Sequence, residues 1–275
     1  MSKNIRTVLF CTMVLVMAVF IVGCNPFEKP EDVANEYYMN VADSKFDKAY
    51  SLFSKQTKDF YSKEDFVMLL NLEKEVWTLT GLKIDKSGSY KEKIIDGIKF
   101  NDVTEFEVVQ KHIRNGNTEE TSSTTIRNIV KENGKLKVYK EKFDFKKALS
   151  NNYFILGKMY ASGKGKDKDT TQAVDMFKKS LVNNPESLDS IYGLAEVNYE
   201  IKNYDESEKY ANDYISKADD SEAKSDAYVL IGDIYLQREN YDNASKYYNK
   251  AETEYFFNKK VTERKSKLAE KTGKL

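Results

Sequence analysis

The sequence is poor in the residues that most often carry catalytic or metal chemistry. Its 275 residues include two cysteines, three prolines, one tryptophan and a single histidine, His112. Cys11 lies inside an apolar N-terminal run, and only Cys24 follows that run. One histidine excludes the common zinc ligand sets and most Ser-His or Cys-His nucleophile arrangements. We therefore expect no metal, no cofactor and no thiol chemistry in the folded part of the chain.

An excess of charge of either sign is also missing. The chain has 44 basic and 44 acidic side chains, so its formal net charge is zero. Nucleic acid is therefore not an expected partner, because its phosphates are met by strongly basic surfaces. One basic run near the C-terminus is interrupted by Glu263 and Glu270 and predicts a solvated helix: Lys259, Lys260, Arg264, Lys265 and Lys267.

The first 24 residues have the layout of a secretory signal. Lys3 and Arg6 precede an apolar run from Val8 to Val22, and Gly23-Cys24 follows it. The run is shorter than the roughly 20 residues that a membrane-spanning helix needs. An uncleaved signal anchor and a secreted chain without lipid are the alternatives to the interpretation that follows.

Residues 21–24, Ile-Val-Gly-Cys, resemble the lipobox of bacterial lipoproteins. The resemblance implies that the signal peptide, residues 1–23, is removed and that Cys24 carries the lipid. The chain would then be anchored in the cell membrane on its extracytoplasmic face. The linker, residues 24–30, is short, since six extended residues span only about 20 Å. The next domain should therefore lie close to the lipid surface.

Residues 31–148 predict helices followed by strands. Apolar spacing of three and four favours one helix from Glu31 to Phe53, and Ser62 is suited to cap a second helix. From residue 76 the apolar period changes to two. Expected strands cover 76–80, 94–109, 121–130 and 136–142, with turns at Gly88, Gly97, Asn115-Gly116 and Asn133-Gly134.

This α+β order resembles the NTF2-like cone, in which a curved sheet wraps an N-terminal helix. The phrase from Phe46 to Phe53, FDKAYSLF, is similar to a helical turn of envelope-associated members. The resemblance implies a pocket, and some members of the family are enzymes that use an acid and a tyrosine inside it.

Four residues are candidates for such chemistry: Tyr37, Tyr38, Asp65 and Glu107. The apolar stripe of the first helix favours a core role for both tyrosines. Asp65 is explained as a first-turn helix residue, and strand alternation places Glu105 and Glu107 on a solvated face. His112 is expected at the surface, so the sequence favours a protein that is not an enzyme.

Residues 150–258 contain three similar segments. Their small anchor residues are Gly157, Ala195 and Gly232, at offsets of 38 and 37 residues. The segments resemble tetratricopeptide repeats, which are helix-turn-helix units of 34 residues, and the first is similar to the Sel1 type with a longer turn. Residues 259–275 are expected to form a capping helix. The predicted fold class is thus an α+β NTF2-like cone followed by an all-α helical-repeat solenoid.

The longer turn of the first repeat contains Gly163-Lys164-Gly165-Lys166. A phosphate-binding interpretation is not supported, because no strand precedes the motif and it lacks the GK[ST] ending.

Tetratricopeptide arrays bind polypeptides on a concave face formed by their first helices. Repeat position predicts four contacts for an unknown protein or peptide: Lys158, Glu196, Asn198 and Asp233. The leading hypothesis is a membrane-anchored lipoprotein that acts as an interaction scaffold. The alternatives are a receptor for a small apolar or wall-derived ligand in the NTF2-like pocket and, with less support, an acid-base enzyme.

Overall fold

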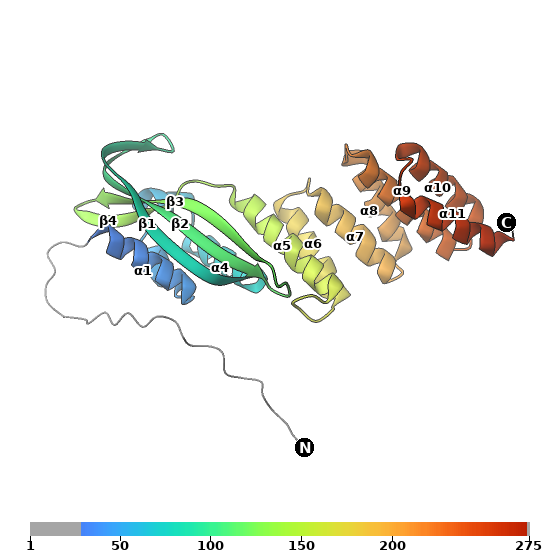
Figure 1. The fold of residues 1–275 in the computed structure, drawn as a ribbon, viewed down its shortest axis with the longest axis horizontal. Coiled ribbons are helices and arrows are strands. Elements are labelled where there is room, and N and C mark those ends of the chain that lie inside the picture. Colours follow the sequence, from blue (N-terminus) through green and yellow to red (C-terminus); the bar gives the residue numbers. More distant parts are fainter. Residues whose placement is uncertain (1–28, 274–275) are drawn as a thin grey trace, which may run out of the picture.

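The computed structural model describes residues 29–273, which form an N-terminal sheet with its helices and a C-terminal row of helices (Figure 1). The N-terminal elements are α1 (Pro30–Ala42), α2 (Phe46–Ser51), α3 (Lys55–Phe60), α4 (Lys63–Val76), β1 (Trp77–Ile95), β2 (Ile98–Arg114), β3 (Glu120–Glu132) and β4 (Lys135–Tyr139).

The four strands form one antiparallel sheet in sequence order. A two-residue turn joins β3 to β4, and both of its residues have positive φ, 50° at Asn133 and 77° at Gly134. This is the backbone of a type I′ hairpin, for which Asn-Gly is the favoured pair. The predicted hairpin is therefore confirmed. Asp96-Gly97 makes the same turn between β1 and β2, with φ values of 51° and 76°.

The single helix expected from Glu31 to Phe53 is wrong, because the chain breaks it into α1 and α2. Ser44 has a φ of 60°, and its N–H donates to the Val41 carbonyl. The next N–H, that of Lys45, donates to the Asn40 carbonyl at 2.7 Å. These two bonds form a Schellman motif, which ends a helix at a left-handed residue.

Two further expectations for this half need correction, and one is confirmed. The sequence pattern does not predict helix α3, and Gly88 lies at a register shift inside β1 rather than in a turn. Ser62 does cap α4, since its hydroxyl accepts the Asp65 N–H at 3.0 Å.

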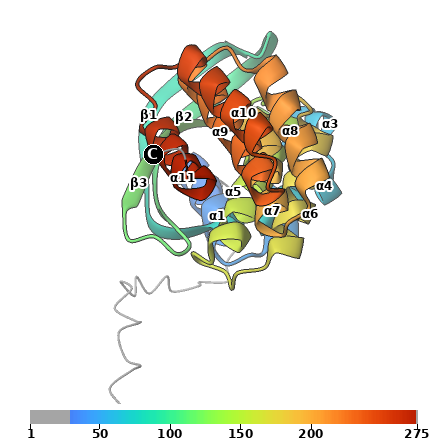
Figure 2. The ribbon, with the colours of Figure 1, turned by 90° about the vertical axis from the view of Figure 1, so that its right-hand side faces the viewer.

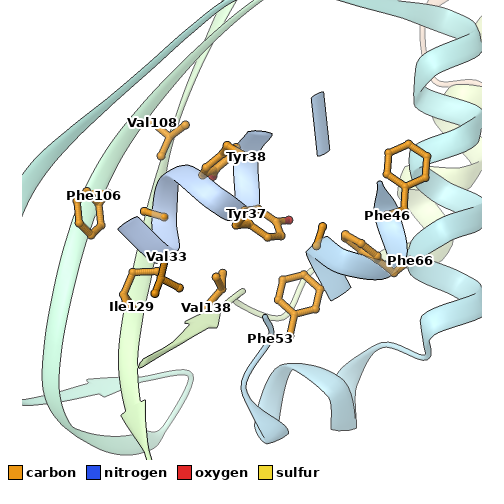
Figure 3. Close-up of a cluster of buried hydrophobic side chains, with 12 residues drawn as sticks. Val33, Tyr37, Tyr38, Phe46, Phe53, Phe66, Phe106, Val108, Ile129 and Val138 are labelled. Carbon is orange, nitrogen blue, oxygen red and sulfur yellow. The ribbon is translucent and has the colours of Figure 1, made fainter. Parts of the chain in front are cut away.

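Helix α1 packs on one face of the sheet through a large apolar cluster (Figure 3). Tyr37 lies in the middle of this cluster, with Phe106 and Ile129 of the sheet on one side and Phe66 of α4 on the other. The tyrosine rings are packed at short range, with 4.9 Å between the centroids of Tyr37 and Tyr38. Both tyrosines are buried, which confirms their predicted core role.

The C-terminal half is a run of seven helices within the described residues. They are α5 (Phe145–Ser162), α6 (Thr170–Asn183), α7 (Leu188–Glu200), α8 (Tyr204–Lys217), α9 (Ser221–Gln237), α10 (Tyr241–Glu254) and α11 (Lys259–Thr272). Each of the pairs α5–α6, α7–α8 and α9–α10 packs together, and α11 packs on α9 and α10. This matches the expected three helix pairs followed by one more helix.

Small residues allow the two helices of a pair to approach closely. A Cβ added to Gly157 would lie 2.7 Å from the ring of Phe177, and one added to Gly232 would lie 2.4 Å from the ring of Tyr248. Both distances are shorter than a side chain tolerates, so the large ring of one helix fills the space that glycine leaves on the other.

The two halves share an apolar cluster instead of meeting through a free linker. Leu69, Leu72 and Val76 of α4 pack with Leu149 and Leu156 of α5, and α6 contributes to the same cluster. Helix α5 begins at Phe145, before the expected boundary at 148–150. In Figure 2, α4 lies on the same side of the row as the second helices α6 and α8. Helix α4 therefore covers α5 as the second helix of a preceding repeat would.

The glycine-containing turn of the first repeat strengthens this junction. A Cβ on Gly165 would lie 2.2 Å from the carbonyl oxygen of Asn115, in the turn between β2 and β3. Gly165 also has a φ of 82°, so it is required both for its conformation and for the close approach. Lys166 adds an ion pair with Glu75 at 3.2 Å. The turn thus packs against the sheet.

We expect Leu69→Ala to destabilise both halves together. Leu69 is 2% exposed in the shared cluster, and such truncations cost about 2–5 kcal/mol. Chemical denaturation would be followed by Trp77 fluorescence, which reports on the junction, and by circular dichroism, which reports on the helices. Both signals should show the same shift of the denaturation midpoint. Met68→Ala is the matched control, because Met68 is exposed on the same helix. Two separate transitions, with only one of them shifted, would contradict a shared core.

Candidate functional site

Cys24 and the signal-like segment lie outside the described residues. Among residues 29–273, no helix has the length and apolar character that crossing a membrane requires. The same residues contain no group of three or more His, Cys, Asp or Glu side chains that could hold a metal ion.

Two of the four predicted partner contacts are free at the surface of the first helices. We use the term first-helix face for the surface that α5, α7, α9 and α11 form together. Lys158 of α5 is exposed, with its Nζ 5.6 Å from the ring centroid of Phe154. Glu196 of α7 is exposed and makes no hydrogen bond or ion pair with any described residue.

Charges from other first helices act on the exposed carboxyl of Glu196. Burial raises the pKa of its carboxyl, while the charges of Lys260 and Lys158 lower it. Lys158 and Lys260 come from α5 and α11, so the charges of three first helices act at this point.

Tyrosine rings flank Glu196 along α7. Tyr192 packs against Tyr214 with 5.0 Å between ring centroids, and burial raises the pKa of the Tyr192 hydroxyl. Tyr199 is also partly buried, and burial raises its pKa as well. Large amphipathic rings beside a free charge are a frequent composition of protein-binding surfaces.

The other two predicted contacts serve the fold. Asn198 is 5% exposed, and its amide donates to the Leu194 carbonyl at 2.8 Å. Its side-chain oxygen accepts a hydrogen bond from Asn203 at 3.1 Å, which holds the turn between α7 and α8. Asn198 is therefore not available to a partner.

Asp233 of α9 holds α10 and α11 in place. Its Oδ1 accepts a hydrogen bond from the Tyr248 hydroxyl at 2.7 Å, and the Arg264 Nε donates to both carboxylate oxygens at 2.8 and 2.9 Å. The sequence predicts that Arg264 lies on a solvated helix surface, but Arg264 is instead paired with Asp233. Two lysines of the same run are also paired, Lys260 with Asp226 and Lys265 with Glu252, each at 2.5 Å.

In the N-terminal half, the four catalytic candidates are not brought together. Asp65 occupies the first turn of α4, and Glu107 is exposed on β2. Glu105, expected on the solvated face, is instead buried and forms an ion pair with Lys93. The Arg127 Nε donates to the Tyr38 hydroxyl at 3.2 Å, so the Tyr38 hydroxyl is occupied by a part-buried arginine.

A cavity of about 680 Å³ opens between α1, α4, the sheet and α5. Its apolar wall includes Val41, Phe46, Leu70 and Trp77, and its polar wall includes Gln110 and His112 of β2. The volume falls in the range of small-molecule sites. His112, expected at the surface, thus lines the cavity, and burial lowers its pKa.

The cavity also has a carboxylate that sequence reasoning missed. Glu73 lines it from α4, burial raises the pKa of its carboxyl, and it has no hydrogen-bond partner among the described side chains. The stripe Phe66, Leu70 and Glu73, at helical spacing, was the available sequence signal. Asn152 contributes to the cavity from α5, so this site spans both halves of the chain.

We expect Asp233→Asn to loosen the C-terminal helix. Loss of the carboxylate leaves the part-buried Arg264 without its main acceptor, at a cost of about 1–3 kcal/mol. Hydrogen exchange should show faster exchange in α11 and little change in α5. Asp219→Asn is the control, since Asp219 is exposed and forms no side-chain bond within the described residues. Unchanged α11 exchange in Asp233→Asn would contradict this role.

The comparison with known families identifies one repeat. Residues 225–254, which cover most of α9 and all of α10, match the tetratricopeptide repeat family model. No curated protein matches the chain. The match covers the third helix pair, and the run of helices in the C-terminal half is consistent with a repeat region of this type.

Proposed function

We propose that the C-terminal half binds a polypeptide partner on the first-helix face and that the protein acts as an interaction scaffold. The observation that carries the proposal is the pair of free, opposite charges at Glu196 and Lys158, beside Tyr192 on the surface that such repeats use for binding. The other acidic groups nearby, Asp226 and Asp233, already have basic partners. Glu196 is therefore the carboxylate available for a basic side chain of the partner.

We also propose that Cys24 carries a lipid anchor and that the N-terminal half is an NTF2-like domain next to the membrane. Support for the anchor comes from the sequence pattern of residues 1–24. Support for the domain type comes from the long α1 helix packed on one face of an antiparallel sheet, with a cavity at one end. The scaffold would then present its repeats to the extracytoplasmic space.

A second function, reception of a small ligand, is favoured by the cavity between α4 and the sheet. It combines an apolar wall with two titratable side chains, Glu73 and His112, that form no hydrogen bond within residues 29–273, and ligand sites often have such a composition. The acid-base enzyme has less support, because Asp65 and Glu107 do not reach the interior.

We expect Glu196→Lys to abolish capture of the partner. The reversed charge would repel a basic side chain and add to the positive charge of Lys158 and Lys260. The native and variant full-length chains would each be crosslinked to proteins of detergent-solubilised membranes. Quantitative mass spectrometry would then compare the proteins that each chain captures. Glu206→Lys is the control, since it makes the same charge change on the second helix α8, where the pair with Lys209 is exposed and weak.

A protein that is crosslinked to native and Glu206→Lys chains but lost with Glu196→Lys would be the partner. If the two variants lose the same proteins, or neither loses any, the first-helix face is not the binding surface. Point variants are preferable to truncation at residue 148, because truncation would uncover Leu69 and Leu72 of the shared cluster.

We expect Cys24→Ala to release the protein from the membrane or to block its processing. A chain without the thiol cannot receive lipid on sulfur, and the remaining apolar run is too short to span a bilayer. Fractionation and mass spectrometry of the mature N-terminus measure both outcomes. Cys11→Ala is the matched control, since Cys11 lies within the segment that would be removed. Membrane retention of an unprocessed Cys24→Ala chain would favour the signal anchor.

A further inference from the structure

We propose that strand β3 pairs with β3 of a second copy of this chain, in an antiparallel register centred on Ser123. The first part of β3 is a flat free edge, whereas the other edges of the sheet are bulged, interrupted or covered. Two side chains of opposite charge, Glu119 and Arg127, lie at the ends of this free edge. This self-association does not depend on the repeats, the cavity or the lipid anchor.

The free edge of β3 covers residues 120–127. On one side, β3 pairs with β2 over residues 120–129 without a register shift. On the other side, β4 pairs only with residues 128–132, so no strand lies beside the first part of β3. The first seven residues of β3 are all exposed, on both faces of the strand. The outward backbone N–H and C=O groups of this edge are therefore open to another strand.

The other edges of the sheet have features that hinder pairing with a further strand. Strand β1 has two register shifts, one of them at Gly88. On β4, the Val138 N–H donates to the Leu52 carbonyl, and the Val138 carbonyl accepts the Ser54 N–H, each at 2.9 Å. Asp102 has a φ of 51°, which interrupts the part of β2 that extends beyond β3. Bulges and covering segments are the devices by which natural sheets avoid edge pairing.

The free edge of β3 lacks such protection. Residues 121–126, Thr-Ser-Ser-Thr-Thr-Ile, contain no charge, no proline and no glycine. Threonine and isoleucine favour the extended conformation, and the usual gatekeepers of an exposed edge, lysine and proline, are missing from this run. An edge of this kind favours addition of a strand, with backbone hydrogen bonds supplying the contact.

The charges at the ends of the edge identify a second copy as the added strand. In a symmetric antiparallel pair, directly opposite residues point to the same face, so their numbers differ by an even count. A centre at Ser123 places Glu119 of each copy opposite Arg127 of the other. Centres one residue earlier or later place both side chains opposite uncharged residues. The register centred on Ser123 thus pairs opposite charges at both ends.

Glu119 and Arg127 are both available for this pairing. Glu119 is exposed and forms no ion pair within residues 29–273. Arg127 is part-buried, its Nε donates to the Tyr38 hydroxyl, and its terminal nitrogens form no hydrogen bond or ion pair in the same residues. They can therefore donate to a carboxylate beside the edge. Glu120 does not compete, because it is already paired with Lys111 at 3.1 Å.

The expected contact is a small one. Seven opposed residues on each strand form about six to eight backbone hydrogen bonds, because alternate pairs exchange two bonds each. One strand pair is smaller than a standard interface of about 800 Å² per partner. We therefore expect reversible association rather than a permanent dimer.

Cysteine substitution tests the register. In the proposed pair, the two copies of residue 123 are opposite each other, with about 4.5–5.5 Å between their Cα atoms, and a disulfide spans this distance. Residues 122 and 124 are opposite one another, and each lies about 8 Å from its own copy, which is too far for a disulfide.

Full-length chains would be oxidised in the whole lysate of the cells that express them. Ser123→Cys should give a disulfide-linked dimer. Ser122→Cys and Thr124→Cys should give none when either is present alone, but the two chains together should form a mixed dimer. The native chain measures the background from Cys11 and Cys24.

Exchange of charge tests the two end residues. Glu119→Arg and Arg127→Glu each place like charges at both ends of the pair, so capture between two differently tagged copies of either variant should fall at least about tenfold. The two variants together have opposite charges at both ends again, and they should capture each other as well as native chains do. Glu107→Arg is the control, since this exposed side chain lies on β2, and it should leave capture unchanged.

The possible results decide for or against the strand pair. Equal disulfide yields at residues 122, 123 and 124, or no yield above the native background, would overturn it. Reduced capture by each charge variant, with recovery in the mixture, would support it, whereas capture that no charge variant changes would assign self-association to another surface. If the thermal midpoint shows that Arg127→Glu does not fold, Glu119→Arg and the cysteine variants decide the result.

Discussion

The apolar contact between α4 and α5 is the interaction on which both halves depend. A helical repeat cannot cover its own faces, so the first and last units of an array need a cover. Helix α11 covers the C-terminal end, held by the Asp233–Arg264 pair. At the other end α4 takes the place of a preceding second helix, and Leu69, Leu72 and Val76 close the core. The sheet domain is therefore structurally the N-terminal cap of the repeats.

This arrangement fixes the distance between the two candidate sites. Helix α5 supplies Asn152 to the cavity and Lys158, six residues later, to the first-helix face. The Gly165–Asn115 contact and the Lys166–Glu75 pair tie the following turn to the sheet. A change in the position of α5 at the cavity would therefore be transmitted to the first-helix face. Helix α5 therefore connects the two proposed sites, although neither proposed function requires the other.

Sequence reasoning succeeded where a local pattern determines the structure. Asn133-Gly134 predicts the turn between β3 and β4, and Ser62 predicts the cap of α4. The small residues of the repeats predict the close helix pairs. It failed at Ser44, because the Schellman bonds that end α1 leave no distinct residue signature there. The first repeat also departs from the family pattern for a structural reason, since its longer turn packs against the sheet.

The charged residues were harder to predict, because their roles depend on partners distant in the chain. Asp233 and Arg264 are 31 residues apart, and Glu105 is paired with Lys93 of the neighbouring strand. Strand alternation marks charged positions as solvated, and this rule fails for Glu105. What distinguishes these sites is whether the charge is balanced. Asp233 is paired inside the protein and stabilises it, whereas Glu196 is exposed and has no partner among residues 29–273, which leaves its charge for a binding partner.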